Sequence, residues 1–206
     1  MSFDIAVLVS GEGTNLQALI DGVHGREGIE IVAVAASRAD AGGLVRAQRA
    51  GVETGVFAIA DHVDRVGRDA ALADWLDERG ADLIVLAGFM EVLTPEFIRR
   101  FAGRIINVHP ALLPAFPGVR AIEQALEYGV KVGGVTIHFV DEGVDTGPVL
   151  LQEAFDLPYH RDIAKIEERV HQIEHRLLPA AVRLVAQGRV RIDPDNPRLV
   201  HVDVPD

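Results

Sequence analysis

Short apolar segments alternate with segments of helical spacing in the first half of this 206-residue chain. Residues 5–9, 31–36 and 83–87 are continuous apolar runs, which is the pattern of strands buried on both faces of a parallel sheet. Parallel neighbours need long crossover connections, which usually contain a helix and turn in a right-handed sense. The alternation therefore predicts a Rossmann-like, doubly wound α/β sheet.

The segments between these runs have the features of helices. Leu16, Leu19 and Ile20 recur at helical spacing, and residues 44–50 and 64–79 are each followed by a glycine that can end a helix. Residues 55–59 are expected to add one more strand. Each strand in this half therefore has a helix available to cross back over the sheet.

The second half has a different pattern. Residues 132–140 and 149–155 are expected strands, and the loop between them is too short for a helical crossover. An antiparallel pair follows, so the sheet is mostly parallel with an antiparallel C-terminal part, flanked by helices. Residues 193–206 are rich in Pro and Asp and are expected to form a loosely held tail. A long C-terminal helix is expected from apolar residues at helical spacing, namely Ile163, Ile166, Val170, Ile173 and Leu177.

The composition excludes several classes of protein. A formal net charge of −11 argues against nonspecific nucleic-acid or anionic-membrane binding, although a small anionic ligand needs only a local site. The chain has no cysteine, so a disulfide framework or thiolate metal site is ruled out. The N-terminus has neither the basic segment nor the apolar run of a signal peptide, and no stretch has the length of a membrane span. We expect a cytoplasmic protein.

An amide, an imidazole and a carboxylate form the strongest candidate for a catalytic group. Asn107 and His109 lie two residues apart at the end of a short strand, so they project to the same side. Open α/β sheets bind their ligands at this carboxyl edge. Asp145 lies in a glycine-flanked loop and can join them, although aspartate is also common as a turn residue and histidine at strand ends.

The loop over residues 10–15 is a second candidate site, for an anion. It joins a strand to a helix, and the free backbone N–H groups at a helix start attract phosphate. Thr14 and Gln17 have capping-box spacing, which predicts Thr14 as the helix cap. An ordinary glycine turn is the alternative, because the loop lacks the third glycine of the dinucleotide fingerprint.

Four motifs together resemble the glycinamide ribonucleotide formyltransferase family. They are Ser-Gly-Glu-Gly-Thr-Asn-Leu-Gln at 10–17, Ala-Gly-Phe-Met at 87–90, Asn-Val-His-Pro-Ala-Leu-Leu-Pro from 107, and Asp-Thr-Gly-Pro-Val-Leu from 145. The resemblance covers roughly the whole chain in the family's order. It implies formyl transfer from 10-formyltetrahydrofolate, as co-substrate, to the amine of glycinamide ribonucleotide in purine biosynthesis. One formyltransferase domain over residues 1–206 is expected, with a phosphate-binding half at about 1–100 and a catalytic, folate-binding half at about 101–190.

The resemblance also implies roles for individual residues. Asn107, His109 and Asp145 are the expected catalytic residues, with Asp145 holding His109 protonated, and His138 is expected to support them. Glu91 departs from the basic residue that some members carry beside Met90, which affects only the contact to the folate's acidic tail. The ribonucleotide is expected to contact Gly13, Thr14, Asn15, Arg65 and Glu174. The folate is expected to contact Phe89, Met90, Val92, Leu93, Val140, Asp141 and Gly143.

Three other functions share some of these features. Formyltetrahydrofolate deformylase has the same catalytic segments but usually an extra N-terminal regulatory domain. Methionyl-tRNA formyltransferase usually has a C-terminal RNA-binding domain, for which this chain lacks positive charge. A noncatalytic nucleotide-binding module would explain the glycine loop and leave Asn107, His109 and Asp145 without a role.

Glu174 separates the transferase from the hydrolase. It lies four residues after Val170 and three before Leu177, so it borders the apolar stripe of the C-terminal helix. A salt bridge at the edge of the stripe is one interpretation. The family implies instead that Glu174 orients the substrate amine, which a hydrolase would not need.

No metal is expected. His171 and His175 are four residues apart on a helix, but no nearby carboxylate pattern completes a zinc motif. The other histidines, including His24, His62, His160 and His201, show no metal-ligand spacing. The expected partners are two small-molecule substrates, with no nucleic acid and no membrane, for a monomer or a homodimer.

Overall fold

The computed structural model describes residues 2–157 and 162–203. It contains a seven-stranded sheet with the strand order β3-β2-β1-β4-β5-β6-β7 and a separate two-stranded sheet, β8-β9. The expected fold class is confirmed, because the large sheet is mostly parallel, antiparallel at its C-terminal end and flanked by helices. The chain separates into two compact units, Met1–Asn107 and Val108–Asp206.

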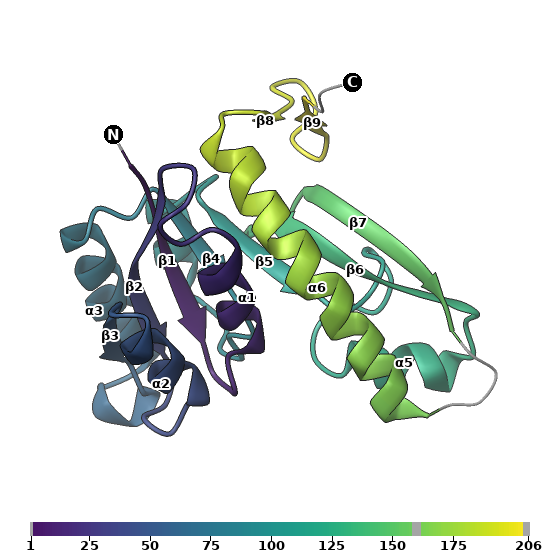
Figure 1. Ribbon diagram of the computed structural model, residues 1–206, viewed down its shortest axis with the longest axis horizontal. Coiled ribbons are helices and arrows are strands. Elements are labelled where there is room, and N and C mark those ends of the chain that lie inside the picture. The colour runs from purple at the N-terminus through teal and green to yellow at the C-terminus, as the bar shows by residue number, and fades with distance from the viewer. Residues whose placement is uncertain (1, 158–161, 204–206) are drawn as a thin grey trace. The chain divides into compact units, whose positions relative to one another are not determined.

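The first unit has a parallel sheet (Figure 1). The apolar runs predicted from the sequence form its central strands. In the first of them every residue from Ile5 to Val9 is fully buried, as expected for a strand that is covered on both faces. Strand β5 begins in this unit, pairing Ile105 with Ile84. The strands are β1 (Phe3–Val9), β2 (Ile29–Ala36), β3 (Glu53–Val56), β4 (Leu83–Leu86) and β5 (Ile105–His109).

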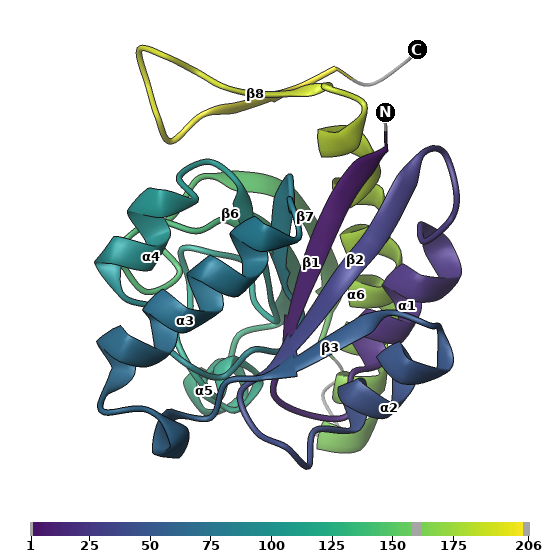
Figure 2. The ribbon, with the colours of Figure 1, turned by 90° about the vertical axis from the view of Figure 1, so that its left-hand side faces the viewer.

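Helices cover both faces of this parallel sheet. Figure 2 shows α1 (Thr14–Gly22) and α2 (Gly42–Arg49) on one face, and α3 (Arg65–Glu78) and α4 (Pro95–Arg100) on the other. The first three helices were expected, α1 from its apolar spacing and α2 and α3 as segments followed by a glycine, whereas the short α4 was not. Asp64 caps α3 by accepting a hydrogen bond from the Gly67 amide.

The third strand differs from its expected bounds of 55–59. It ends at Val56, and Ile59 instead begins the 3-10 helix η1 (Ile59–Asp61). Val56 pairs with Ala36, the last residue of β2, and the Phe57 amide makes the final hydrogen bond, to the Ala36 carbonyl oxygen. The end of the partner strand therefore sets the end of this strand.

The second unit contains the predicted antiparallel pair. Strand β6 (Val132–Phe139) pairs with β7 (Val149–Asp156), from Val132 opposite Asp156 to His138 opposite Val149. The long helix α6 (Ile163–Ala186) is also confirmed, and it buries Ile166, Val170, Ile173 and Leu177 of the expected stripe. Ile163, which was expected in the same stripe, is the first residue of the helix and is 45% exposed. A shorter helix, α5 (Ala121–Tyr128), was not expected.

The C-terminal segment is more ordered than expected. Strand β8 (Val190–Ile192) pairs with β9 (Val200–Val202), so the prediction of a loosely held tail was wrong for residues up to 203. Asp193 holds the connection, because its carboxylate accepts the amides of Asp195 and Asn196 and contacts His201 Nε2 at 2.8 Å. Residues 204–206 lie outside the described part of the chain.

None of the helices in the described ranges has the length and apolarity that a membrane crossing demands.

Candidate active site

Strand β5 carries two of the three expected catalytic residues. Asn107 and His109 both lie in the strand, so the alternation of a strand directs them to the same side. Asn107 is half-buried, and His109 is only 4% exposed. The strand ends at His109, and prolines at 110, 114 and 117 stiffen the loop that follows.

Both ring nitrogens of His109 face oxygen atoms. Nε2 lies 2.8 Å from the Phe116 carbonyl oxygen, and Nδ1 lies 3.3 Å from Oδ2 of Asp145. Phe116 has a φ of 54°, in the left-handed region that is uncommon for residues other than glycine. The proline loop therefore turns its backbone toward the imidazole, and the contact with Phe116 fixes the ring.

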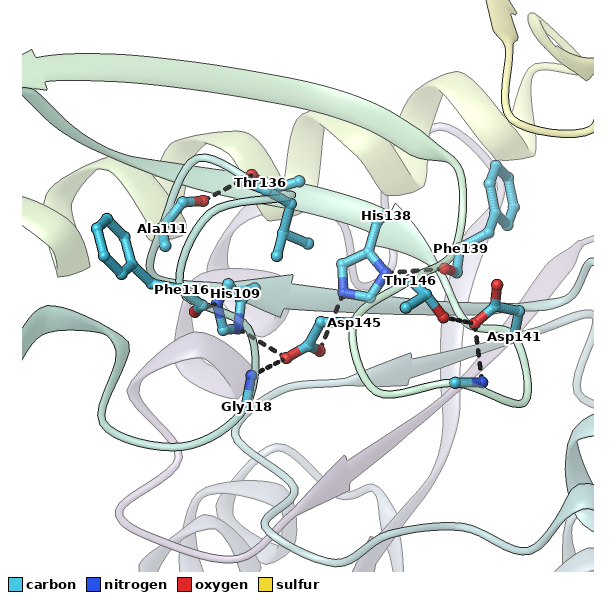
Figure 3. Close-up of polar contacts among 12 residues, drawn as sticks. His109, Ala111, Phe116, Gly118, Thr136, His138, Phe139, Asp141, Asp145 and Thr146 are labelled. Atoms are coloured by element: carbon cyan, nitrogen blue, oxygen red, sulfur yellow. Dashed lines mark hydrogen bonds and ion pairs between the residues drawn. The ribbon is translucent and has the colours of Figure 1, made fainter. Parts of the chain in front are cut away.

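Asp145 lies between two imidazoles (Figure 3). Its Oδ2 faces His109 and accepts the Gly118 amide at 2.7 Å, whereas its Oδ1 lies 3.5 Å from Nε2 of His138. His138 is 2% exposed on β6, and its Nδ1 lies 2.8 Å from the Phe139 carbonyl oxygen. The expected grouping of His138 with His109 and Asp145 is therefore present in the second unit.

The loop that carries Asp145 is closely packed. The Asp141 carboxylate accepts the Gly143 amide at 3.1 Å and the Thr146 hydroxyl at 2.5 Å. A Cβ atom on Gly147 would lie 1.8 Å from the Phe139 carbonyl oxygen, so only glycine fits there. Arg198, in the connection between β8 and β9, donates to the Thr146 carbonyl oxygen at 2.9 Å. These contacts define the position of the Asp145 carboxylate.

The electrostatics of His109 differ from the expectation. Burial lowers the pKa of His109 below its ordinary value of 6.5, and this outweighs the opposing effects of the Asp145 charge and the Phe116 carbonyl. His109 is therefore neutral at pH 7 in the free protein, and the prediction that Asp145 holds it protonated was wrong. Desolvation wins because the ring is almost fully enclosed.

Asp145 is shifted in the direction that favours its charge. Burial alone would raise the pKa of this carboxyl, but the hydrogen bonds from His138 and Gly118 and the charge of His109 lower it below 3.8. Asp145 is therefore an anion at neutral pH. A neutral imidazole beside a carboxylate is an arrangement that can accept one proton and stabilise it.

Glu174 has the position predicted from the spacing on α6. It is 6% exposed among the buried residues of the helix, which is uncommon for a carboxylate. The exposed salt bridge nearby is made by a different residue, Arg176, with Glu153. Burial alone does not separate the two interpretations of Glu174, because a ligand-binding carboxylate and a structural one can both be buried.

The glycine loop lies in the first unit and corrects one detail of the expectation. The residue that caps α1 is Gly13, with a φ of 72°, and no side chain caps the helix, so the assignment of Thr14 was wrong. The Gln17 side chain donates to Asp21 and accepts from Arg46 instead of turning back to the cap. The predicted phosphate contacts at 13–15 and Arg65, which is exposed at the start of α3, remain predictions.

The expected folate segment, also in the first unit, combines buried and exposed apolar residues. Phe89 and Leu93 are buried, whereas Met90 is 69% exposed and Val92 is 57% exposed. An ordinary core segment would bury all four. Exposed apolar side chains beside buried ones suit a wall against which a flat apolar ligand can pack.

Sequence reasoning did not find Phe116, Gly118 or Arg198. The first two act through their backbone, as the Phe116 carbonyl oxygen that contacts His109 and the Gly118 amide that donates to Asp145. Arg198 acts through its side chain, which donates to the Thr146 carbonyl oxygen. The prolines at 110, 114 and 117 were the only signal that the first two lie in a rigid loop. Within residues 2–157 and 162–203 no group of three or more His, Cys, Asp or Glu side chains could hold a metal ion, and His160 lies outside that part.

Residues 3–182 match the family described as formyl transferase. The chain belongs to the formyl transferase family. Phosphoribosylglycinamide formyltransferase from Haemophilus influenzae is 41% identical over 189 residues, which cover 91% of this chain and 89% of that protein. The human trifunctional purine biosynthetic protein adenosine-3 is 44% identical over 189 residues, which cover 91% of this chain and 19% of that longer protein.

A solved structure agrees with this membership of the formyl transferase family. Glycinamide ribonucleotide transformylase 1 from Symbiobacterium toebii superimposes with a TM-score of 0.93 and is 46% identical. The superposition covers 98% of this chain and 94% of that chain. The similarity therefore extends over the whole fold and is not confined to a single motif.

Proposed function

We propose that this protein transfers the formyl group of 10-formyltetrahydrofolate to the amine of glycinamide ribonucleotide. The products are formylglycinamide ribonucleotide and tetrahydrofolate. The observation that carries the proposal is the buried His109 imidazole 3.3 Å from Asp145, on a strand that also bears Asn107, in a formyl transferase. The relatives in bacteria are phosphoribosylglycinamide formyltransferases over nearly their full length, which supports this choice of substrates.

The proposed chemistry is a direct attack of the amine on the formyl carbon. A new C–N bond forms as the electron pair of the C=O bond moves to the formyl oxygen, which becomes negative in the tetrahedral intermediate. Asn107 and His109 project to the same side of β5, so both are assigned to this oxygen, His109 through Nε2 in place of its contact with the Phe116 carbonyl. No side chain of the catalytic group is a good covalent nucleophile, so an acyl-enzyme is not part of the proposal.

Protonation of His109 accompanies the attack. The free imidazole is neutral because it is buried, and the developing oxyanion adds a second negative group beside the ring. An added negative charge raises the proton affinity of the imidazole, so His109 gains a proton as the intermediate forms. Asp145 stabilises the resulting imidazolium and helps to move the proton that the attacking amine loses. The intermediate then collapses: the C=O bond re-forms, the bond between the formyl carbon and N10 of the folate breaks, and N10 takes up a proton as tetrahydrofolate leaves.

The same proposal assigns the substrate contacts. The backbone at Gly13, Thr14 and Asn15, at the start of α1, would bind the ribonucleotide phosphate together with Arg65. Glu174 would orient the substrate amine. The folate would pack on the exposed apolar pair Met90 and Val92, with the other expected contacts at Phe89, Leu93, Val140, Asp141 and Gly143.

Hydrolysis of the formyl donor is the competing reaction. A deformylase would direct water at the formyl carbon with the same three catalytic side chains. The bacterial relatives favour the transferase, and in that reaction Glu174 would orient the substrate amine, whereas a hydrolase has no amine to orient.

Parallel product assays test the proposal. Purified protein is mixed with 10-formyltetrahydrofolate, with and without glycinamide ribonucleotide, and both formylglycinamide ribonucleotide and free formate are measured. We expect formyl transfer that depends on the ribonucleotide and little formate. Formate release that is independent of the ribonucleotide would establish the hydrolase instead.

A further inference from the structure

A buried ion pair outside the catalytic group lies on α3. Arg68 is 0% exposed and Asp69 is 1% exposed, and Nε of Arg68 donates to Oδ1 of Asp69 at 2.5 Å. Charged side chains are almost never fully buried unless they are paired, and both members of this pair are adjacent on one helix. The substrate contacts proposed above include neither residue.

Stability alone is a poor explanation for the pair. Removing two charges from water opposes folding, and replacing a buried pair by apolar residues is often neutral or stabilising. Nη1 and Nη2 of Arg68 have no hydrogen-bond partner within the described residues, which increases this penalty. The pair therefore calls for a role beyond its own interaction energy.

The pair contacts both ends of one irregular segment, residues 89–94. Oδ2 of Asp69 accepts the Thr94 amide at 2.6 Å, and the guanidinium carbon of Arg68 lies 5.7 Å from the centre of the Phe89 ring, in cation–π geometry. Thr94 then caps α4 through its hydroxyl. The segment between β4 and α4 is thus fixed by the ion pair where it begins and where it ends.

Side chains replace the hydrogen bonds that a strand would supply to this segment. Residues 89–94 lie in no helix or strand. Between the two contacts of the ion pair, the Met90 amide donates to the Ser10 hydroxyl oxygen at 2.8 Å, and the Ser37 hydroxyl donates to the same oxygen at 2.7 Å. These anchors hold the segment in a shape that leaves Met90 and Val92 exposed.

We propose that Arg68 and Asp69 are positioning residues that fix the 89–94 segment as a binding wall for the flat ring system of the folate. This inference rests on the proposed function, since the folate contact at residues 89–93 belongs to it. The pair acts through Phe89 and Thr94 and touches no reacting atom. Its loss would therefore weaken folate binding and spare the ribonucleotide.

Three variants separate the roles of the charge and of the acceptor. Asp69→Leu removes the acceptor of the Thr94 amide, and Asp69→Asn keeps an oxygen there while removing the charge. Arg68→Met keeps the apolar stem and removes the guanidinium. Asp74→Asn is the matched control, because Asp74 lies on the same helix but pairs with Arg100 at the surface.

Hydrogen–deuterium exchange and substrate kinetics provide the two measurements. We expect Asp69→Leu to speed exchange at residues 89–94 and to raise the KM for the formyl donor about tenfold, since small misplacements of a positioning element have large effects on rate. The KM for the ribonucleotide should stay within about twofold of the parent value. Arg68→Met should act in the same direction, Asp69→Asn more weakly, and Asp74→Asn should change neither measurement.

The outcomes distinguish this inference from the proposed function. Unchanged exchange at 89–94 in both Asp69→Leu and Arg68→Met would overturn the positioning role. Faster exchange at 89–94 with an unchanged KM for the formyl donor would show that the folate does not bind this segment, and would overturn the inference. The proposed formyl transfer would be left standing, because it is measured separately. If Asp69→Leu does not fold, the milder Asp69→Asn and Arg68→Met decide, and an equal rise of both KM values in them would indicate a general structural defect and reject the inference.

Discussion

Nδ1 of His109 lies 3.3 Å from Oδ2 of Asp145, and the other oxygen of the same carboxylate, Oδ1, lies 3.5 Å from Nε2 of His138. One carboxylate thus serves two buried imidazoles. Because burial lowers the pKa of His109 while its neighbours lower that of Asp145, the pair is neutral imidazole and carboxylate at pH 7 in the free protein. The pair is therefore ready to accept a proton during the reaction.

The first prediction concerns the catalytic group. His109→Asn, Asp145→Asn and Asn107→Ala should each lower kcat by about a hundred- to a thousandfold, because a preorganised donor or its partner is lost at the developing oxyanion. Binding of the formyl donor should be largely retained. Steady-state kinetics and direct binding measure the two effects.

His201→Asn is the control, because it breaks a similar histidine–aspartate contact in the C-terminal ribbon and should leave kcat unchanged. Turnover near the parent value in any of the three variants would remove that residue from the mechanism.

The second prediction concerns stability against pH. The pKa of His109 is lower in the folded protein than its ordinary 6.5, so the unfolded chain binds the extra proton first. His109 therefore reduces stability as the pH falls below about 6.5, until the folded pKa is reached. Denaturant unfolding between about pH 5 and pH 8 should show a smaller loss of stability in His109→Asn than in the parent. An identical pH dependence would contradict the assigned direction.

Asp145 also affects the stability of the folded protein, at acidic pH. Its pKa is lowered below 3.8 on folding, so its contribution to stability is present above that pH and is lost as the pH falls through the folded pKa. Acid unfolding of Asp145→Asn should lack this component. Because the charge of His109 contributes to the lowered pKa of Asp145, the comparison at low pH should also include His109→Asn.

The third prediction concerns His138 as a partner of Asp145. The hydrogen bond from His138 lowers the pKa of the Asp145 carboxyl, so His138→Leu should raise that pKa. The acidic limb of the kcat/KM profile should then move to higher pH. A uniform loss of activity at every pH, with the limb unmoved, would assign His138 a packing role only.

The fourth prediction concerns the anion site. Arg65→Ala should raise the KM for the ribonucleotide and leave that for the formyl donor unchanged, because Arg65 is exposed at the start of α3 and would contact only the phosphate. Arg26→Ala, on the loop before β2, is the control for the general loss of a positive charge. An equal effect of the two variants would reduce the role of Arg65 to general electrostatics.

Gly13 gives a harsher test of the same site. Gly13 has a φ of 72°, and a Cβ atom there would lie 2.6 Å from the Gly43 Cα, so Gly13→Val should lower protein stability as well as ribonucleotide affinity. Thermal unfolding should be measured together with affinity in this variant. A stable variant that binds the ribonucleotide normally would contradict the assigned backbone approach.

The fifth prediction concerns Glu174. Glu174→Ala should raise the KM for the ribonucleotide and reduce transfer, because the amine loses the carboxylate that orients it. Glu174→Gln keeps the size and a hydrogen-bonding oxygen but removes the charge, so it should have the smaller effect on stability. The KM for the formyl donor should be unchanged in both. A change in thermal stability alone would favour the structural salt bridge.

Local patterns were sufficient to predict much of the fold. The apolar runs that became β1, β2 and β4 and the stripe on α6 could be recognised because burial in a given element follows a fixed period along the chain. The same regularity placed Asn107 and His109 on one side of β5 and made Asp145 a reasonable partner. These predictions depend on residues close in sequence.

Contacts between distant residues decided the rest. Gly13 and not Thr14 caps α1, and the Gln17 side chain contacts Arg46 of the next helix instead of the cap. The supposed tail forms the β8–β9 ribbon by pairing residues 190–192 with residues 200–202. Burial reversed the expected charge of His109, and the Arg68–Asp69 pair became visible only once both side chains were enclosed. Periodicity depends only on the chain itself, so the sequence determined most of the long elements and the candidate catalytic residues. Desolvation and hydrogen bonding depend on everything packed around a site, so the tertiary structure determined the charges of these residues and the contacts that hold them.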